Sequence, residues 1–255
     1  MASRVSRSSA LFSVGPSMGF SPIRERVRPA SADELRTIPW LDALLPTERR
    51  HAEAALVVGE AMPGDLLCRV GRAPTYWFGV IEGLLKMSND SADGSSVTYS
   101  GLPPGGWFGE GTALKREPYR YNILALRPSV IGGLPIDDFH WLLDHSIGFN
   151  RFVMNQLNER LGQFIAALEI DRLTSPDARV ARSLGALFNP VLYPGVGDLL
   201  RITQQELAYL VGLSRQRVNQ ALTALQAQGA IRVEYGGLRV LDLPALRSVS
   251  AMGKR

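Results

Sequence analysis

The residues with the clearest chemistry lie in the segment SRQRVNQAL near the C-terminus. Its polar side chains are those of Arg215, Gln216, Arg217, Asn219 and Gln220. Guanidinium and amide groups supply the donors and acceptors that match the edges of DNA bases, and arginine also pairs with phosphate. The same composition is also typical of a plain solvated helix face, so the elements around the segment must decide between the two interpretations.

Two short helices joined by a tight turn are predicted over Thr203–Leu225. Thr203 and Glu206 form a T-x-x-E capping box, and Ser214 can cap the second helix. Gly212 stands where the chain must turn, which favours a positive φ. Apolar residues recur at helical spacing on the inner faces: Leu207, Ala208, Val211, Val218, Leu222 and Leu225. This layout is typical of a DNA-reading helix-turn-helix.

A hairpin is predicted directly behind the second helix, in AIRVEYGGLRVLDL. Alternating Ile231, Val233 and Tyr235 give one strand, and Gly236-Gly237 is expected to form the two-residue turn. A hairpin in this place is a wing, which touches the DNA backbone, and Arg232 and Arg239 lie on or near it. The wing favours DNA binding over a plain helical bundle.

The charge is unevenly distributed along the 255 residues. The overall net charge of +4 divides into +4 over residues 1–30, −5 over 31–172 and +5 over 173–255. A basic C-terminal domain on an acidic body suits a nucleic-acid partner at one end only.

Cysteine content and hydropathy indicate the compartment. Cys68 is the only cysteine, which excludes an internal disulfide framework, and a small buried apolar role is expected for it. No apolar run approaches the roughly 18–20 residues that span a bilayer, and the N-terminus has no clear secretory signal. Residues 1–32 are expected to form a disordered basic arm. The expected compartment is the cytoplasm, with no membrane partner.

The N-terminal half indicates a sensor domain over residues 33–145. A helix is expected over 33–57, followed by short strand-like runs separated by Gly, Pro, Asp and Asn. Strands at this spacing predict a small β-barrel or sandwich. A polar turn at Asn89–Ser95 and a helix at Asp137–Leu143 complete it. The fold class is therefore α+β.

A long helix over 146–173 carries an apolar seam at alternating steps of three and four. The seam includes Met154, Leu157, Leu161, Phe164 and Leu168. Such a seam favours packing against a symmetry mate in a homodimer. The alternative is packing on the chain's own barrel, but Phe152, Val153 and Ile165 offer a second face for that. A hinge is expected at Thr174-Ser175-Pro176, then a winged domain over 174–248 and a tail over 249–255.

The order of helix, β-roll, long helix and winged helix-turn-helix resembles the Crp/Fnr family of bacterial transcription regulators. The resemblance covers about residues 35–245, and SRQRVNQAL with its wing and PGGWFGE carry it best. It implies a jelly-roll sensor, a homodimer on a two-fold-symmetric DNA site, and an effector that acts through the long helix. RNA polymerase and a small-molecule effector stay open as further partners.

The resemblance assigns roles within the DNA-binding segment. Arg215, Gln216 and Gln220 occupy base-reading positions, and a bidentate contact from Arg215 to guanine contributes roughly 1–3 kcal/mol of discrimination. The phosphate contacts fall to Thr203, Ser214 and Arg217, and Asn219 and Arg232 complete the expected interface. Well-known members carry an acidic residue where this chain has Gln216, so a different preferred site is expected.

The resemblance also places an effector pocket in the roll. Gly109, Glu110 and Arg120 match cyclic-nucleotide-binding members in type and spacing, with Arg120 suited to phosphate and Glu110 to a ribose hydroxyl. Tyr121 replaces the small hydroxyl residue, and Phe164 and Ile165 replace polar contacts to a purine. Two hypotheses remain: a cyclic-AMP-responsive regulator, or a ligand-independent one in which Glu110 and Arg120 pair with each other. No cofactor is required by either.

An enzyme and a non-DNA dimerisation module are the other classes. Residues 57–136 contain no histidine, which excludes the ligand set of a metal-dependent cupin, and no G-x-S-x-G nucleophile motif occurs. His51, His140 and His145 fit no haem-ligand pattern, so no metal site is expected. The basic recognition face argues against a module that only dimerises.

Overall fold

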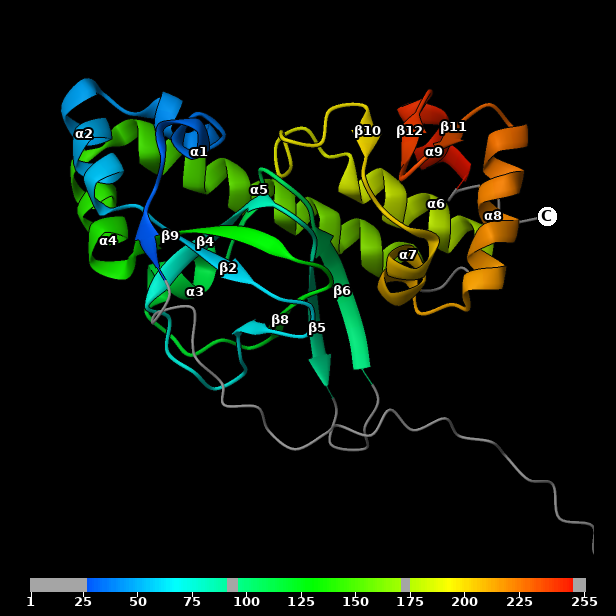
Figure 1. The fold of residues 1–255 in the computed structure, drawn as a ribbon, viewed down its shortest axis with the longest axis horizontal. Helices are drawn as coiled ribbons and strands as arrows, with labels where there is room; N and C mark the ends of the chain where they lie inside the picture. The colour runs from blue at the N-terminus through cyan, green and yellow to red at the C-terminus, as the bar shows by residue number, and fades with distance from the viewer. Residues whose placement is uncertain (1–26, 91–95, 171–174, 250–255) are drawn as a thin grey trace, which may run out of the picture.

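The computed structural model describes residues 27–90, 96–170 and 175–249. The chain forms an N-terminal β-roll with short helices at one end, a long helix along its side, and a C-terminal helical domain with a small sheet (Figure 1). This is the mixed helix and sheet architecture that the sequence predicts. Most of the arm predicted over 1–32 lies outside the described residues.

The first helical region is broken by prolines. The structure has α1 (Ala32–Arg36), a 3₁₀ turn at Pro39–Ala43 and α2 (Pro46–Ala55) in place of the single helix predicted over 33–57. Proline removes a backbone donor and favours the first turn of a helix, so each proline starts a new segment. The arm boundary at 32 is also wrong, because β1 (Arg28–Pro29) pairs with β2.

Two antiparallel sheets form the roll. One sheet has the order β1-β2-β9-β4-β7 and the other β3-β8-β5-β6. The strands are β2 (Val57–Ala61), β3 (Leu66–Cys68), β4 (Tyr76–Glu82), β5 (Leu85–Asp90), β6 (Ser96–Leu102), β7 (Trp107–Phe108), β8 (Asn122–Ala125) and β9 (Ser129–Pro135). The turn predicted at Asn89–Ser95 falls mainly outside the described residues. Helix α3 (Glu110–Lys115) interrupts the strands directly after β7.

An aromatic cluster joins the first sheet to the helices at its end. The ring of Trp107 lies 4.5 Å from that of Trp77 and 5.2 Å from that of Trp40, measured between centroids. A Cβ at Gly79 would lie 2.2 Å from Trp107, so only glycine leaves room for that ring. The cluster fixes β4 and β7, and β7 leads directly into the residues of the predicted effector pocket.

Helices α4 (Ile136–His145) and α5 (Ile147–Ile170) follow the roll, and α5 runs along the molecule toward the C-terminal domain (Figure 1). Val153 is buried against the roll and Phe152 packs partly beside it, as predicted. Ile165 does not, because its side chain is 51% exposed. The inner face of α5 therefore covers the roll along the first part of the helix only.

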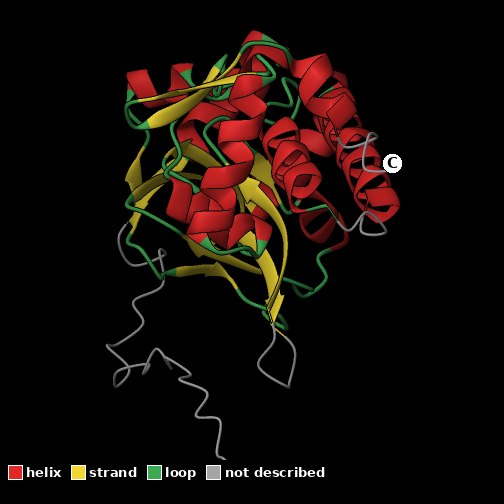
Figure 2. Ribbon diagram, turned by 90° about the vertical axis from the view of Figure 1, so that its right-hand side faces the viewer, coloured by secondary structure: helices red, strands yellow, loops and turns green. Residues whose placement is uncertain are grey.

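The C-terminal domain is a winged helix-turn-helix, seen from its own side in Figure 2. Its helices are α6 (Pro176–Leu187), α7 (Gln204–Val211), α8 (Arg215–Ala227) and α9 (Leu243–Val249); its strands are β10 (Leu199–Leu200), β11 (Ile231–Glu234) and β12 (Gly237–Val240). Glu234 pairs with Gly237, so the hairpin turn is Tyr235-Gly236 rather than the predicted Gly236-Gly237. Gly236 supplies the positive φ of 75° that this turn requires.

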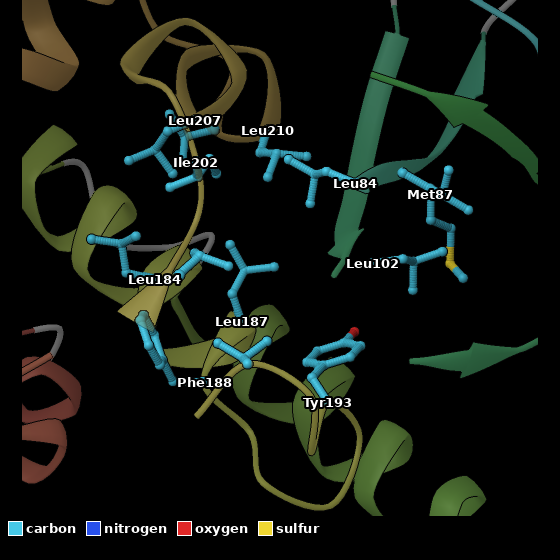
Figure 3. Packing of buried hydrophobic residues seen from close by; sticks show 14 of the residues in the cluster. Leu84, Met87, Leu102, Leu184, Leu187, Phe188, Tyr193, Ile202, Leu207 and Leu210 are labelled. Atoms are coloured by element: carbon cyan, nitrogen blue, oxygen red, sulfur yellow. The ribbon is translucent and has the colours of Figure 1, made fainter. Parts of the chain in front are cut away.

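The roll and the C-terminal domain share one hydrophobic core. Leu84 and Leu102 of the roll face Leu187 and Leu210 of the C-terminal domain (Figure 3), and all four belong to one buried cluster. The two domains are therefore packed together in this structure.

Candidate nucleic-acid interface and effector pocket

The first helix of the motif begins at the predicted capping box. Thr203 Oγ1 accepts from the backbone N–H of Glu206 at 3.1 Å, and the Glu206 carboxylate accepts from the N–H of Thr203 at 2.7 Å. Gly212 ends the helix with a φ of 65°, and Ser214 Oγ accepts from the N–H of Arg217 at 3.2 Å. These caps fix where α8 begins and therefore which side chains it exposes.

Helix α8 divides into a buried and an exposed face. Val218, Leu222 and Leu225 are at most 1% exposed and hold the helix on the domain core. On the other face Arg215 and Gln216 are exposed, with Gln220 one turn further along. Within the described part of the chain these three polar side chains make no hydrogen bond or ion pair, so their donors and acceptors are available to a partner.

Two other residues of the predicted interface are held within the domain. The Arg217 guanidinium forms an ion pair with Asp177 at 2.7 Å, and the Oδ1 atom of Asn219 accepts from Nε2 of Gln204 at 3.0 Å. Both side chains are at least partly exposed. Arg217 must release Asp177 before it can bind a phosphate. The structure therefore does not present Arg217 as a free phosphate-binding residue.

The wing exposes one arginine and holds another. Arg232 is exposed and lies opposite Arg239 in the strand register. The Arg239 guanidinium donates to Glu234 at 2.7 Å and also contacts Asp198. The hydrogen bond to Glu234 raises the pKa of Arg239, and the same bond lowers the pKa of Glu234. Arg232 is therefore the wing arginine that has no ion pair within the described residues, and it lies near a Tyr235 side chain that is fully exposed at the tip.

A cavity of about 660 Å³ lies beside the roll, between the strands, α3 and α5. Of the four residues that the sequence places in an effector pocket, Glu110, Arg120 and Tyr121 line it, and Gly109 does not. Sequence reasoning missed further lining residues that come from distant parts of the chain: Tyr99, Arg160 and Arg182. Arg182 belongs to α6, so the cavity also reaches the C-terminal domain.

The predicted ion pair between Glu110 and Arg120 is wrong. Nε of Arg160, from α5, donates to Oε1 of Glu110 at 2.6 Å, and Arg160 also donates to the Trp107 carbonyl at 2.8 Å. Arg120 instead pairs with Glu117 at 3.0 Å and is 80% exposed. Position ten after Glu110 matches the family spacing, but the actual partner lies fifty residues away, where no local pattern could indicate it.

Burial and charge shape the inside of the pocket. Burial lowers the pKa of Arg160, but the Glu110 carboxylate together with Tyr193 and Tyr121 raises it by more, so the net shift is upward and the guanidinium stays charged. The other Glu110 oxygen, Oε2, is buried and makes no hydrogen bond within the described residues. Burial raises the pKa of Tyr121, which also hydrogen-bonds Thr112. Tyr121 therefore remains a neutral phenol next to Gly109.

The predicted seam of α5 is largely open to solvent. Met154 is 59% and Leu161 58% exposed. Leu157, which is half-buried, and Phe164, which is 36% exposed, both line the cavity. The side chain of Leu168 lies outside the described residues. An exposed apolar stripe of this kind marks an interaction surface.

The three histidines belong to α2 and α4, and none of them is among the residues that line the cavity. His51 stacks on Trp141 and pairs with Asp138 at 2.8 Å, and His145 also stacks on Trp141. His140 contacts the Ala113 carbonyl. Across the described ranges there is no group of three or more His, Cys, Asp or Glu that could hold a metal ion.

Comparison with known proteins supports the same two units. Residues 59–146 match the family described as a cyclic nucleotide-binding domain, and residues 178–249 match the Crp-like helix-turn-helix domain. The transcriptional regulator LdrP of Thermus thermophilus is 30% identical over 169 residues, which cover 65% of this chain and 82% of LdrP. The chain belongs to the Crp/Fnr family of transcriptional regulators.

Two further similar proteins are consistent with this assignment. The cyclic AMP receptor protein of Thermus thermophilus is 28% identical over 171 residues, covering 67% of this chain and 77% of that protein. The solved structure of FixK2 from Bradyrhizobium japonicum is 15% identical with a TM-score of 0.57, covering 76% of this chain and 96% of FixK2, and shows the same fold. Among the described residues, no helix is both long and apolar enough to cross a membrane.

Proposed function

We propose that this Crp/Fnr regulator acts as a homodimer that reads a two-fold-symmetric DNA site through α8. The proposal is carried by the exposed polar face of Arg215, Gln216 and Gln220, whose side chains have no partner among the described residues. A rigid helix that presents such a face fits the major groove, where the edges of base pairs differ in their donors and acceptors. Arg215 reads guanine, and the two glutamines offer paired amide contacts to adenine.

The phosphate contacts surround this face. Thr203 and Ser214 are exposed at the amino ends of α7 and α8, where backbone N–H groups favour an anion. Arg232 adds a contact from the wing, and Arg217 joins if DNA phosphate replaces Asp177. Such contacts fix the position of the helix on the duplex without reading the sequence.

Dimerisation through α5 follows from its exposed stripe. Met154, Leu161 and Phe164 lie on one side of the helix at spacings of seven and three residues. A second copy of the same helix covers this stripe and places two α8 helices on successive turns of the duplex. The symmetry of the protein then dictates the symmetry of the site.

The pocket supports a regulator that needs no cyclic nucleotide for DNA binding. One Glu110 oxygen is held by Arg160, and the neutral ring of Tyr121 occupies the place expected for a small hydroxyl residue. A cyclic-AMP-responsive regulator is the second candidate. It is favoured by the size of the cavity and by the buried Glu110 Oε2, which could accept from a ribose hydroxyl. The first candidate needs no cofactor, and the second needs only the cyclic nucleotide. We expect the protein to act in the cytoplasm, with RNA polymerase as a further partner.

Selection of random duplex DNA by the purified protein at physiological salt, with and without cyclic AMP, tests the proposal. Enrichment of a symmetric site in both arms supports the ligand-independent homodimer. Enrichment only with the nucleotide favours the second candidate. Enrichment in neither arm contradicts the proposed function.

A further inference from the structure

An arginine of the roll reaches into the DNA-binding domain. Arg127 lies in the turn between β8 and β9, and its guanidinium donates to the Arg201 carbonyl at 2.6 Å. It also forms an ion pair with Glu206 at 2.9 Å. The Arg127 side chain is 26% exposed and that of Glu206 12%, so the pair is shielded from most of the solvent. Shielding of this kind makes an ion pair stronger than a surface pair.

A second contact seats strand β6 against the same domain. A Cβ at Gly101 would lie 2.8 Å from both Leu187 and Leu210, so the strand lies close against α6 and α7. Beside it, the hydroxyls of Ser100 and Tyr193 are 3.3 Å apart. Figure 3 shows Leu187, Leu210 and Tyr193 facing the roll. Arg127 therefore lies at the edge of an apolar interface that already holds the two domains together.

The place of this contact matters for DNA. Arg201 and Glu206 stand on either side of Thr203, which caps α7 and is one of the phosphate contacts proposed above. Arg127 thus contacts residues on both sides of a position proposed to bind the DNA backbone. Glu206 is also the residue whose carboxylate closes the capping box, so Arg127 binds directly to the start of the helix-turn-helix.

We propose that Arg127 is an autoinhibitory latch, which holds the DNA-binding domain against the roll in a pose that binds DNA weakly. The inference rests on the proposed function and adds how the DNA-binding site is regulated. Opening the latch raises the fraction of molecules in the competent pose, and the apparent affinity for DNA rises by the same factor.

The latch and simple electrostatics predict opposite effects of Arg127→Ala on the affinity for DNA. Loss of a cation weakens DNA binding by simple electrostatics, because fewer phosphates are neutralised. The latch predicts the opposite, a tightening of about fivefold or more in the dissociation constant, in the range usual for coupling between two sites. The probe is the duplex selected by the wild-type protein, followed by fluorescence anisotropy at fixed salt. Arg72→Ala, an exposed arginine of the roll without a side-chain partner in the described residues, is the matched control for charge.

Glu206→Gln provides the second variant. Glutamine keeps the capping box but removes the charge that Arg127 binds. Because Glu206→Gln also removes an anion near DNA, its effect on affinity is measured both in the wild-type protein and in the Arg127→Ala variant. The latch predicts that Glu206→Gln tightens binding in the wild type and adds clearly less in the Arg127→Ala protein, since both changes break one interaction.

The outcomes separate the two claims. Tighter binding by Arg127→Ala but not by Arg72→Ala, with non-additive Glu206→Gln, supports the latch. Binding that Arg127→Ala leaves unchanged or weakens overturns the latch alone, and weakening identifies Arg127 as a DNA contact. Failure of the wild type and of every variant to bind any duplex overturns the proposed function, and the latch with it.

Discussion

Arg160 of α5 binds Glu110 of α3 through a 2.6 Å hydrogen bond, with 10% and 2% of the two side chains exposed. The pair joins the roll to the helix that leads into the DNA-binding domain. Glu110 is also the pocket residue that the family spacing assigns to ligand binding. The roll of this regulator therefore carries an internal cation next to its candidate effector site.

Removal of one partner of this pair is expected to destabilise the protein strongly. Arg160→Met leaves the Glu110 charge buried without a partner, a change that typically costs about 3–5 kcal/mol. The free energy of unfolding, measured by urea denaturation, reports the loss. Arg120→Ala is the matched control, because its pair with Glu117 is exposed and its removal is expected to change stability little. Equal stability of Arg160→Met and Arg120→Ala would contradict the buried pair.

The exposed stripe of α5 predicts that one substitution there makes the protein monomeric without unfolding it. Leu161→Glu places a charge in the proposed dimer interface, and since Leu161 is 58% exposed within the single chain, the fold is expected to survive. Light scattering should show the mass halve while the circular dichroism stays unchanged. Asn155→Glu adds the same charge to a solvent-facing position of α5 and should remain dimeric. A dimer that persists in Leu161→Glu argues for a different interface.

Cys68 is expected to be inert in the native protein. Burial raises the pKa of its thiol to about 12 from an ordinary value near 9, so no thiolate forms at pH 8. An alkylating reagent should modify it only after unfolding. Above about pH 9 the thiol ionises in the unfolded protein but stays protonated in the folded one. The free energy of unfolding therefore falls as the pH rises toward 12. Cys68→Ala should show a weaker fall between pH 9 and 11, and rapid labelling of the native thiol would rule out its burial.

The winged helix-turn-helix could be predicted from the sequence because the residues that define it act over short distances along the chain. The capping box of Thr203 and Glu206, the positive φ of Gly212 and the cap at Ser214 all act within a few residues, and each is present. The exposed face of α8 follows directly from those caps.

The parts that the sequence did not predict depend on contacts across the fold. Arg160 meets Glu110, and Arg127 meets Glu206, across 50 and 79 positions respectively. The pairing of Arg217 with Asp177 and the exposure of Ile165 are likewise settled by which helices pack together. The break in the first helix could have been found, since Pro39 and Pro46 mark it in the sequence.

The most direct test of the central claim compares wild type with the Arg215→Ala/Gln216→Ala variant on the selected duplex and on a scrambled one, by anisotropy at physiological salt. The ratio of the two dissociation constants isolates base reading from phosphate attraction. We predict a large ratio for the wild type that falls to near one in the variant, while the variant stays a folded dimer. An undiminished ratio in the folded variant would contradict the assignment of α8 as the helix that reads DNA.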